Sequence, residues 1–403
     1  MSSKSVILGG DFVAKKNYAY INPEMLLWAR SETPFNTVED VEMLFPSIDA
    51  KNLKAWENGD SYPSITEAKK LSKIYKLPFA AFYLSEVPAK KIKKYTDRRT
   101  LKGYFTETIS YDLWCEIQRI ESNRECMLEL LDEETVTKKI PNNLEDNIDK
   151  IAITIRDFLG LNTPLRSKSA YGNNPFNYYR NLLERSGIIV SQISSVSLEE
   201  MKGVSIFYEV YPIVGINNKD YDRSKVFSLF HELAHIFRRS SSLCTIDIDE
   251  YNNHEEYICD RIAAEVLMPT ATFKHLANEY IVRNGAINSE CISSIAGRFG
   301  VSTLSTLRRL HEVKIINKSE FFELFDQISA EYNATLAYLE SSRKGKNIPV
   351  HYHVKYLNQN GFLLPRVLLT AHGNGIITHG ELCRALGIKS KHIASIEQAV
   401  LYK

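Results

Sequence analysis

The chain has 403 residues, a net charge of +1, 44% hydrophobic residues and 25% charged residues, which excludes a polycation and predicts a multidomain globular protein. Because the apolar runs are shorter than a membrane span and no signal-like segment opens the chain, we expect a cytoplasmic protein that does not contact membranes. The six cysteines form no C-x-x-C pair, which indicates reduced thiols and excludes a disulfide framework.

Short helices are predicted in the first part of the chain, residues 1–87, which we expect to form one domain. Asn22 and Pro23 are typical of a helix start, as N-cap and first helical residue. Further apolar-periodic segments cover 38–45, 49–57 and 64–75. Short helices joined by tight turns are typical of helix-turn-helix domains.

The segment around Trp56 resembles a known DNA-binding family. L-L-W-A-R followed by L-K-A-W-E-N-G-D-S-Y-P-S contains the W-E-x-G-x-x-x-P signature of the Xre/Cro-like domain, with Trp56, Glu57, Gly59 and Pro63. The resemblance implies a recognition helix at about 49–56. Its candidate DNA contacts are Lys51, Asn52 and Lys54. An asparagine side chain can pair with adenine, and a lysine side chain can bind guanine or phosphate. The alternative is a helical module that binds protein and leaves these side chains solvated.

Residues 88–143 are expected to form a basic linker and a connecting helix. Six Lys and Arg residues lie between positions 90 and 99, where they could contact phosphate or form a solvated linker. A long polar helix is predicted over 104–134.

Residues 144–287 are predicted to form a mixed domain of helices and strands. Two helices, 148–159 and 177–186, precede strand-like segments at 187–191, 203–210 and 211–217. Residues 226–237 then read V-F-S-L-F-H-E-L-A-H-I-F, without Pro or Gly, which predicts a helix buried beside a site.

This helix carries His231, Glu232 and His235 in the H-E-x-x-H arrangement. Residues four apart lie on one face of a helix, so the two imidazoles can hold one Zn²⁺. Glu232 can then act as the general base toward water. A small sheet beside such a helix is the plan of the zincin metallopeptidases, in which an edge strand commonly pairs with an extended peptide substrate. The alternative is a core helix with hydrogen-bonded histidines.

A catalytic zinc ion normally has a third protein ligand. We expect it on a helix over 253–268, which ends before Pro269 because proline disfavours a helical conformation in the preceding residue. Four candidates lie near its start, and spacing alone does not choose among them: His254, Glu255, Glu256 and Asp260. Since Glu256 and Asp260 share one face, one could bind metal while the other orients a motif histidine.

The two helices together resemble the ImmA/IrrE family of metallo-endopeptidases, which is often fused to an Xre-like domain. The resemblance lies in H-E-L-A-H followed by E-x-x-x-D-R-I-A-A-E-V-L-M-P. It implies a gluzincin-type site with Zn²⁺ held by His231, His235 and Glu256, with Glu232 as general base. Asp260 is then the residue that orients a histidine. Three departures from the family pattern remove no ligand but concern rate and specificity: Phe230, Ala234 and Cys259.

Residues 288–403 are expected to form a mostly helical C-terminal domain. Residues 292–310 are typical of a helix, a turn and a second helix, and 376–388 of a short helical unit opened by Thr378. We find no chemical constellation in this region.

The resemblance implies a regulatory zinc endopeptidase that binds DNA and cleaves a specific repressor or partner protein in stress, phage or toxin–antitoxin control. A neighbouring gene could encode that partner, and a homodimer could read two half-sites. One alternative is a non-proteolytic transcriptional regulator or antitoxin-like binding protein whose zinc domain senses metal or a partner. Another is an N-terminal domain that has become an oligomerisation module. Candidate donors to the oxyanion are Tyr208, Tyr211, Tyr251 and His254.

Overall fold

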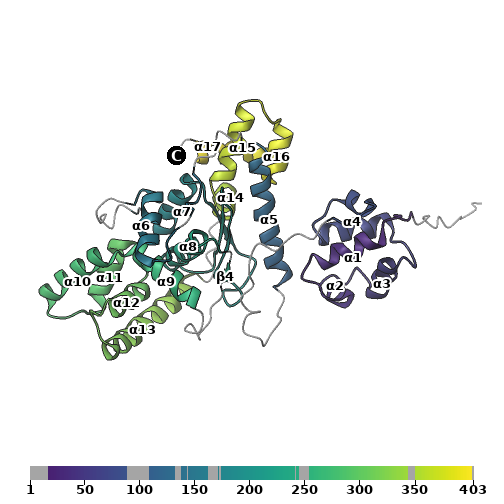
Figure 1. Ribbon diagram of the computed structural model, residues 1–403. Helices are drawn as coiled ribbons and strands as arrows, with labels where there is room; N and C mark the ends of the chain where they lie inside the picture. Colours follow the sequence, from purple (N-terminus) through teal and green to yellow (C-terminus); the bar gives the residue numbers. More distant parts are fainter. Residues whose placement is uncertain are drawn as a thin grey trace, which may run out of the picture. The chain divides into compact units, whose positions relative to one another are not determined.

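The structure is a computed structural model that describes residues 17–88, 109–131, 138–142, 144–161, 171, 174–240, 242–244, 254–343 and 350–401. The described chain is mainly helical with one small sheet, as the sequence predicts (Figure 1). It divides into two compact units. The N-terminal unit comprises Met1–Ile92 and Thr108–Gln118, and the main unit comprises Lys93–Glu107 and Arg119–Lys403. Within the described residues, no helix has the length and apolar character needed to cross a membrane.

The N-terminal unit consists of short capped helices. They are α1 (Pro23–Ser31), α2 (Val38–Leu44), α3 (Ala50–Asn58), α4 (Ile65–Ile74) and the 3-10 helix η1 (Phe79–Tyr83). Each α-helix begins after a side chain that accepts a hydrogen bond from a backbone N–H of its first turn; these caps are Asn22, Thr37, Asp49 and Ser64. The four helices predicted for this region are confirmed.

The W-E-x-G-x-x-x-P residues stabilise this unit through packing and hydrogen bonds. Trp56 is buried in its core. Glu57 accepts hydrogen bonds from Nε and Nη2 of Arg30 at 2.8 and 3.0 Å. Gly59 ends α3 with a φ of +80°, a left-handed conformation that glycine adopts without strain. The carbonyl oxygen of Pro63 accepts a hydrogen bond from the backbone N–H of Ala19 at 2.8 Å.

The connecting helix α5 (Tyr111–Leu128) is shorter than expected. Its first turn begins where the Ser110 hydroxyl accepts a hydrogen bond from the Leu113 backbone N–H at 3.1 Å. The prediction of helix over 104–134 is therefore wrong at residues 109–110 and 129–131. The basic residues 90–99 and the remaining ends of the predicted helix lie outside the described residues.

The main unit contains a four-stranded sheet of order β1-β3-β2-β4. Its strands are β1 (Ile189–Ile193), β2 (Gly203–Ile206), β3 (Ile213–Asn217) and β4 (Ser242–Cys244). β1 runs parallel to β3, while β2 is antiparallel to both β3 and β4. The first three strands were predicted, and β4 was not. Every residue of these three strands is buried.

Residues 207–212 are predicted as strand but lie outside β2 and β3, because other groups bind the backbone of this segment. The Glu209 carbonyl oxygen accepts a hydrogen bond from the Ile140 N–H at 2.9 Å. Arg124 donates to the carbonyl oxygens of Val210 and Tyr211 at 2.8 and 2.9 Å. Tyr211 also has a φ of +53°, which interrupts an extended chain.

Four helices, α6 (Ile148–Leu159), α7 (Pro175–Arg185), α8 (Asp222–Phe237) and α9 (His254–Leu267), form the core with the sheet. α8 packs against β2 and β3 on one side and against α9 on the other, and α9 also contacts α6 (Figure 1). The helices predicted at 148–159, 177–186, 226–237 and 253–268 are thus present, with ends shifted by a few residues. The H-E-x-x-H helix is enclosed by structure on both sides.

The remaining helices form two groups. The green group in Figure 1 contains α10 (Thr270–Asn284), α11 (Ser289–Phe299), α12 (Thr303–Glu312) and α13 (Lys318–Arg343). The yellow group contains α14 (Tyr352–Asn360), α15 (Leu363–Gly373), α16 (His379–Leu386), the 3-10 helix η5 (Ser390–His392) and α17 (Ile393–Leu401). Helices α11 and α12 match the predicted helix, turn and helix, and Thr378 caps α16.

The end of α14 is fixed to β1 by buried polar groups. The fully buried guanidinium of Arg180 donates to the carbonyl oxygens of Asn358 and Val190, each at 2.9 Å. The Ser191 hydroxyl donates to the carbonyl oxygen of Gln359 at 2.7 Å. This edge of the sheet is therefore in contact with the C-terminal helices.

Candidate metal centre

The H-E-x-x-H residues lie on the most deeply buried part of α8. The exposed fractions of His231, Glu232 and His235 are 8%, 1% and 0%. Apolar neighbours explain this burial, since Leu229 and Leu233 of the same helix belong to the main core. Polar side chains at such a depth require partners within the protein.

Three potential ligand residues converge between α8 and α9. Nε2 of His231 and Nε2 of His235 are 3.2 Å apart. Oε2 of Glu256 lies 2.9 Å from Nε2 of His231, and Oε1 of Glu256 lies 3.4 Å from Nε2 of His235. These three residues form a candidate metal-binding group.

The other nitrogen of each imidazole has its own polar neighbour. Nδ1 of His231 lies 2.7 Å from Oδ1 of Asp260, and Nδ1 of His235 lies 3.2 Å from the hydroxyl oxygen of Ser240. A neutral imidazole has one N–H, and these neighbours favour its place on Nδ1. The two Nε2 lone pairs then face the Glu256 carboxylate, which is an arrangement that a cation stabilises.

The spacing of these donor atoms fits a tetrahedral zinc site. Zinc–ligand distances of about 2.0 to 2.2 Å place neighbouring ligand atoms about 3.3 Å apart. The two Nε2 atoms are 3.2 Å apart, and the two carboxylate oxygens of Glu256 lie 2.9 and 3.4 Å from them, which are all near this value. The donor set of two imidazoles and a carboxylate is also one that zinc accepts in catalytic sites.

The charge state of Glu256 suits a ligand. Burial by itself raises the pKa of this carboxyl, but hydrogen bonds and charge interactions with His231 and His235, in the protonated form that carries a proton on Nε2, outweigh burial. The net effect holds the pKa of Glu256 well below its usual range. Glu256 is therefore an anion at neutral pH, as a metal-binding carboxylate must be.

The geometry separates the four candidates on α9. His254 is exposed at the first position of the helix. Glu255 accepts hydrogen bonds from Nε and Nη2 of Arg238, both at 2.8 Å. Glu256 and Asp260 are the two that contact His231. The spacing of four on a helix explains why this pair reaches the same imidazole.

Cys259 lies on the far side of His235. Its sulfur is 3.4 Å from Nδ1 of His235, and the structure describes a second candidate group of His235, Glu255 and Cys259. Burial raises the pKa of the Cys259 thiol. Glu255 of this second group is already paired with Arg238, so the Nε2 side of His235 is the better site.

One of the four candidate oxyanion donors, Tyr208, is engaged elsewhere. The Tyr208 hydroxyl donates to Oε1 of Glu121 at 3.0 Å, and the Tyr208 ring stacks on Arg124. Tyr211 is buried, with an exposed fraction of 5%. Tyr251 lies outside the described residues.

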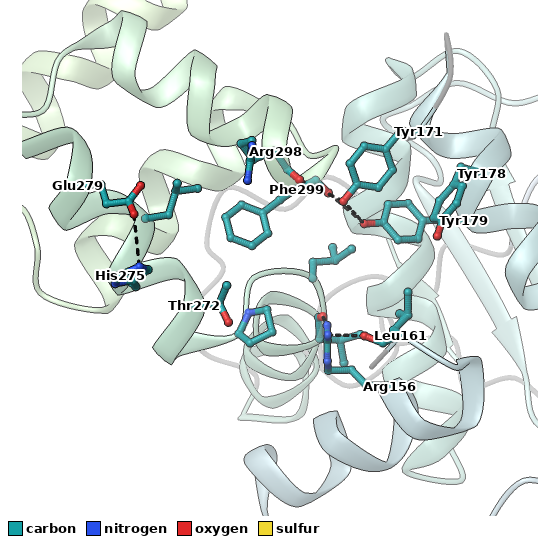
Figure 2. A pocket seen from close by; sticks show the side chains of 14 residues that line it. Arg156, Leu161, Tyr171, Tyr178, Tyr179, Thr272, His275, Glu279, Arg298 and Phe299 are labelled. Carbon is teal, nitrogen blue, oxygen red and sulfur yellow. Dashed lines mark hydrogen bonds and ion pairs between the residues drawn. The ribbon is translucent and has the colours of Figure 1, made fainter. Parts of the chain in front are cut away.

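A separate hollow of about 450 Å³ lies near the other end of α9. Figure 2 shows its lining, in which Tyr171, Tyr179 and Arg156 already make hydrogen bonds within the protein. The hydroxyl groups of Tyr171 and Tyr179 donate to the backbone carbonyls of Arg298 and Phe299, and Arg156 donates to the carbonyls of Leu161 and Val266. Its lining contains no residue of the candidate metal-binding group.

The candidate DNA contacts lie together on α3. Lys51, Asn52 and Lys54 are exposed, while Leu53 between them is buried. Their exposure is compatible with a contact surface on this helix.

Comparison with known proteins finds a family match in the central part of the chain. Residues 184–311 match the model of the peptidase M78 family, described as the IrrE N-terminal-like domain. The matched residues include the whole sheet and α8 and α9, which carry the candidate metal-binding group. This finding supports the resemblance to ImmA/IrrE metallopeptidases. No curated protein sequence matches the chain.

Proposed function

We propose that the chain is a zinc-dependent regulatory endopeptidase whose N-terminal unit binds DNA. The observation that carries the proposal is the convergence of Nε2 of His231, Nε2 of His235 and the Glu256 carboxylate beside Glu232. The match to a peptidase family over the same residues supports the metallopeptidase assignment.

His231, His235 and Glu256 would hold the metal ion. When bound, zinc lowers the pKa of a water molecule and polarises the carbonyl group of a substrate. Asp260 fixes the orientation of His231 through Nδ1, which keeps Nε2 directed at the ion. The Ser240 hydroxyl group lies at Nδ1 of His235 and would orient that ring in the same way.

Glu232 would serve as the general base. It follows the first histidine on α8 and is almost completely buried. Its carboxylate would accept the proton of the attacking water and deliver it to the amine nitrogen that leaves. Neither step changes the charge of the three ligand residues.

The substrate would be a protein segment in extended conformation. One edge of the sheet, β1, contacts the end of α14 through Ser191. The order of the sheet puts β4 at the opposite side, next to β2. A peptide that added its backbone at this side would use hydrogen bonds common in peptide recognition. We propose that this segment belongs to a repressor or another regulatory partner.

The N-terminal unit would direct this activity to gene control. Lys51, Asn52 and Lys54 project from α3 in an exposed group, and their side chains suit phosphate and base-edge contacts. The resemblance of the surrounding signature to Xre/Cro-like domains supports α3 as the recognition helix.

The test is co-expression of the chain with the protein encoded by the neighbouring gene. Wild-type protein should cleave the partner, and Glu232→Gln should retain zinc but leave the partner intact. Glu199→Gln is a matched control, since Glu199 is exposed in the same unit, and it should cleave as wild type does. Full complementation of a deletion strain by Glu232→Gln would favour a non-proteolytic regulator.

A further inference from the structure

We infer that Gly203, the first residue of β2, is a positioning residue for Glu232. The inference rests on the proposed function, in which Glu232 is the general base. Gly203 would act by having no side chain, which leaves space for the Glu232 carboxyl group beside the strand.

The evidence is a direct approach of Glu232 to the Gly203 backbone. A Cβ atom at position 203 would lie 2.4 Å from Oε1 of Glu232, 2.8 Å from its Cγ and 2.9 Å from its Cδ. All three distances are shorter than van der Waals contact, so alanine and the present Glu232 conformation exclude each other.

Backbone conformation does not explain the glycine. Gly203 is absent from the residues with positive φ in the described chain, so an alanine could adopt the same extended backbone. Glycine normally weakens a strand, and within strands it often marks a close approach by another group. The close approach of Glu232 supplies the physical reason for glycine here.

Neither partner can easily move away. Gly203 pairs with Ile216 on one side and with Cys244 on the other, so β2 is held between two strands. Glu232 has an exposed fraction of 1%, and its helix α8 packs against β2, β3 and α9. A methyl group at position 203 would therefore displace the carboxylate.

The displacement would affect the general base but not the metal ligands. His231, His235 and Glu256 contact one another between α8 and α9, and none of them is among the atoms nearest to position 203. We expect Gly203→Ala to keep the metal-binding group and to misplace Glu232.

Gly215 offers a matched control in the neighbouring strand. A Cβ atom there would meet Cγ1 of Val204 at 2.7 Å and Cδ1 of Ile193 at 3.1 Å, which are apolar side-chain ends. Gly215→Ala thus crowds the same sheet without a contact to Glu232.

The first arm of the test measures thermal unfolding in a mutant cycle. Gly203→Ala should lower the Tm by about 3 to 10 °C in the wild-type and Glu232→Gln backgrounds, where a side chain of the same length remains. The shift should vanish with Glu232→Ala, whereas Gly215→Ala should give the same shift in all three. If the Gly203→Ala variant does not fold, recovery of folding when Glu232→Ala is added would equally support the inference. An equal loss in every background would overturn the inference.

The second arm measures acetohydroxamate binding to the zinc-loaded protein, which requires no peptide substrate. Acetohydroxamate binds a metal ion through two oxygens and makes a hydrogen bond to a neighbouring base. Gly203→Ala and Glu232→Gln should each weaken binding about tenfold or more at unchanged zinc content, as expected for a lost hydrogen bond to a charged group. Gly215→Ala should bind as wild type. Wild-type affinity in Gly203→Ala would contradict the positioning role. Failure to cleave a partner protein would instead concern the proposed function, because neither arm depends on cleavage.

Discussion

Nδ1 of His231 lies 2.7 Å from Oδ1 of Asp260, across the contact between α8 and α9. Asp260 is partly exposed, with 41% of its side chain accessible, while the imidazole of His231 is largely buried. The contact fixes both the orientation of the ring and the nitrogen that carries its proton. We therefore propose that Asp260 contributes to metal binding through His231 without contacting the converging ligand atoms.

Replacement of Asp260 should weaken zinc binding without abolishing it. We expect Asp260→Ala to lower zinc affinity about 10- to 100-fold, because the His231 ring loses the partner that orients it. The measurement is competition with a zinc chelator. Glu290→Ala removes an exposed carboxylate from α11 and is the control. Equal affinities in the Asp260 and Glu290 variants would show that the contact is not used.

The Arg238–Glu255 pair should hold the first turn of α9 in place. The guanidinium makes two hydrogen bonds to the Glu255 carboxylate, each 2.8 Å long, next to Glu256. Arg238→Lys keeps the charge but loses this paired geometry. We expect amide hydrogen exchange in the first turn of α9 to accelerate at least about tenfold, since a hydrogen bond between charged groups contributes about 1.5 to 3 kcal/mol. Exchange in α15 should stay unchanged, whereas the start of α6 is not a control because Arg238 also binds Asp146. Unaltered exchange in α9 would show that Arg238 does not stabilise its first turn.

Glu265 should stabilise the main unit in a pH-dependent way. Burial raises its pKa, but hydrogen bonds from Thr270 and interactions with Arg309 outweigh burial, so the pKa is lowered from 4.5. A lowered pKa means that the folded state favours the carboxylate. This contribution is present above the unfolded pKa and is lost as pH falls through the folded pKa. Glu265→Gln should reduce stability by about 1 to 3 kcal/mol at pH 7. The Tm difference from wild type should shrink as pH falls below about 4.5.

Glu312 also pairs with Arg309, but its pKa shifts in the opposite direction to that of Glu265. Burial raises its pKa above 4.5 despite the attraction of Arg309 and Arg261. The folded state therefore favours its protonated form, and wild type gains stability as pH falls through the raised pKa. Glu312→Gln should lower the Tm at pH 7 less than Glu265→Gln does. Identical pH profiles for the two variants would contradict the assigned pKa directions.

Exposed residues of α3 should determine DNA affinity without affecting folding. Replacing Lys51, Asn52 and Lys54 with alanine should weaken binding to the protein's own promoter DNA. The salt dependence should fall by about one unit of slope for each DNA phosphate that the variant no longer binds. The control is Lys70→Ala with Lys73→Ala, which removes exposed charges from α4. Unchanged affinity in the α3 variant would favour an oligomerisation module.

The sequence predicted the elements whose signals are local. Asn22 and Thr378 cap helices where expected, because capping depends on neighbours in the chain. Helical spacing left four candidates for the third ligand and the family resemblance implied Glu256, which the packing of α8 on α9 brings against both histidines. The ends of β2 and β3 were missed because they depend on Arg124 and Ile140, which are distant in sequence.

Contacts between distant segments were not accessible from the sequence. β4 has only three residues and is defined by its pairing with β2. The Arg238–Glu255 pair joins the end of α8 to the start of α9. The glycine at position 203 has no turn or helix end to mark it, and its meaning depends on the approach of Glu232 from another element.

The zinc-to-protein ratio of purified wild type and Glu256→Ala tests the central claim most directly. Glu256→Ala removes one of the three converging ligands. After dialysis against a moderate chelator, we predict about one zinc ion per wild-type chain and less than about one tenth in the variant, given the cost of losing a metal ligand. Equal zinc content in the two proteins, or none in wild type, would contradict the assignment of His231, His235 and Glu256 as the metal site.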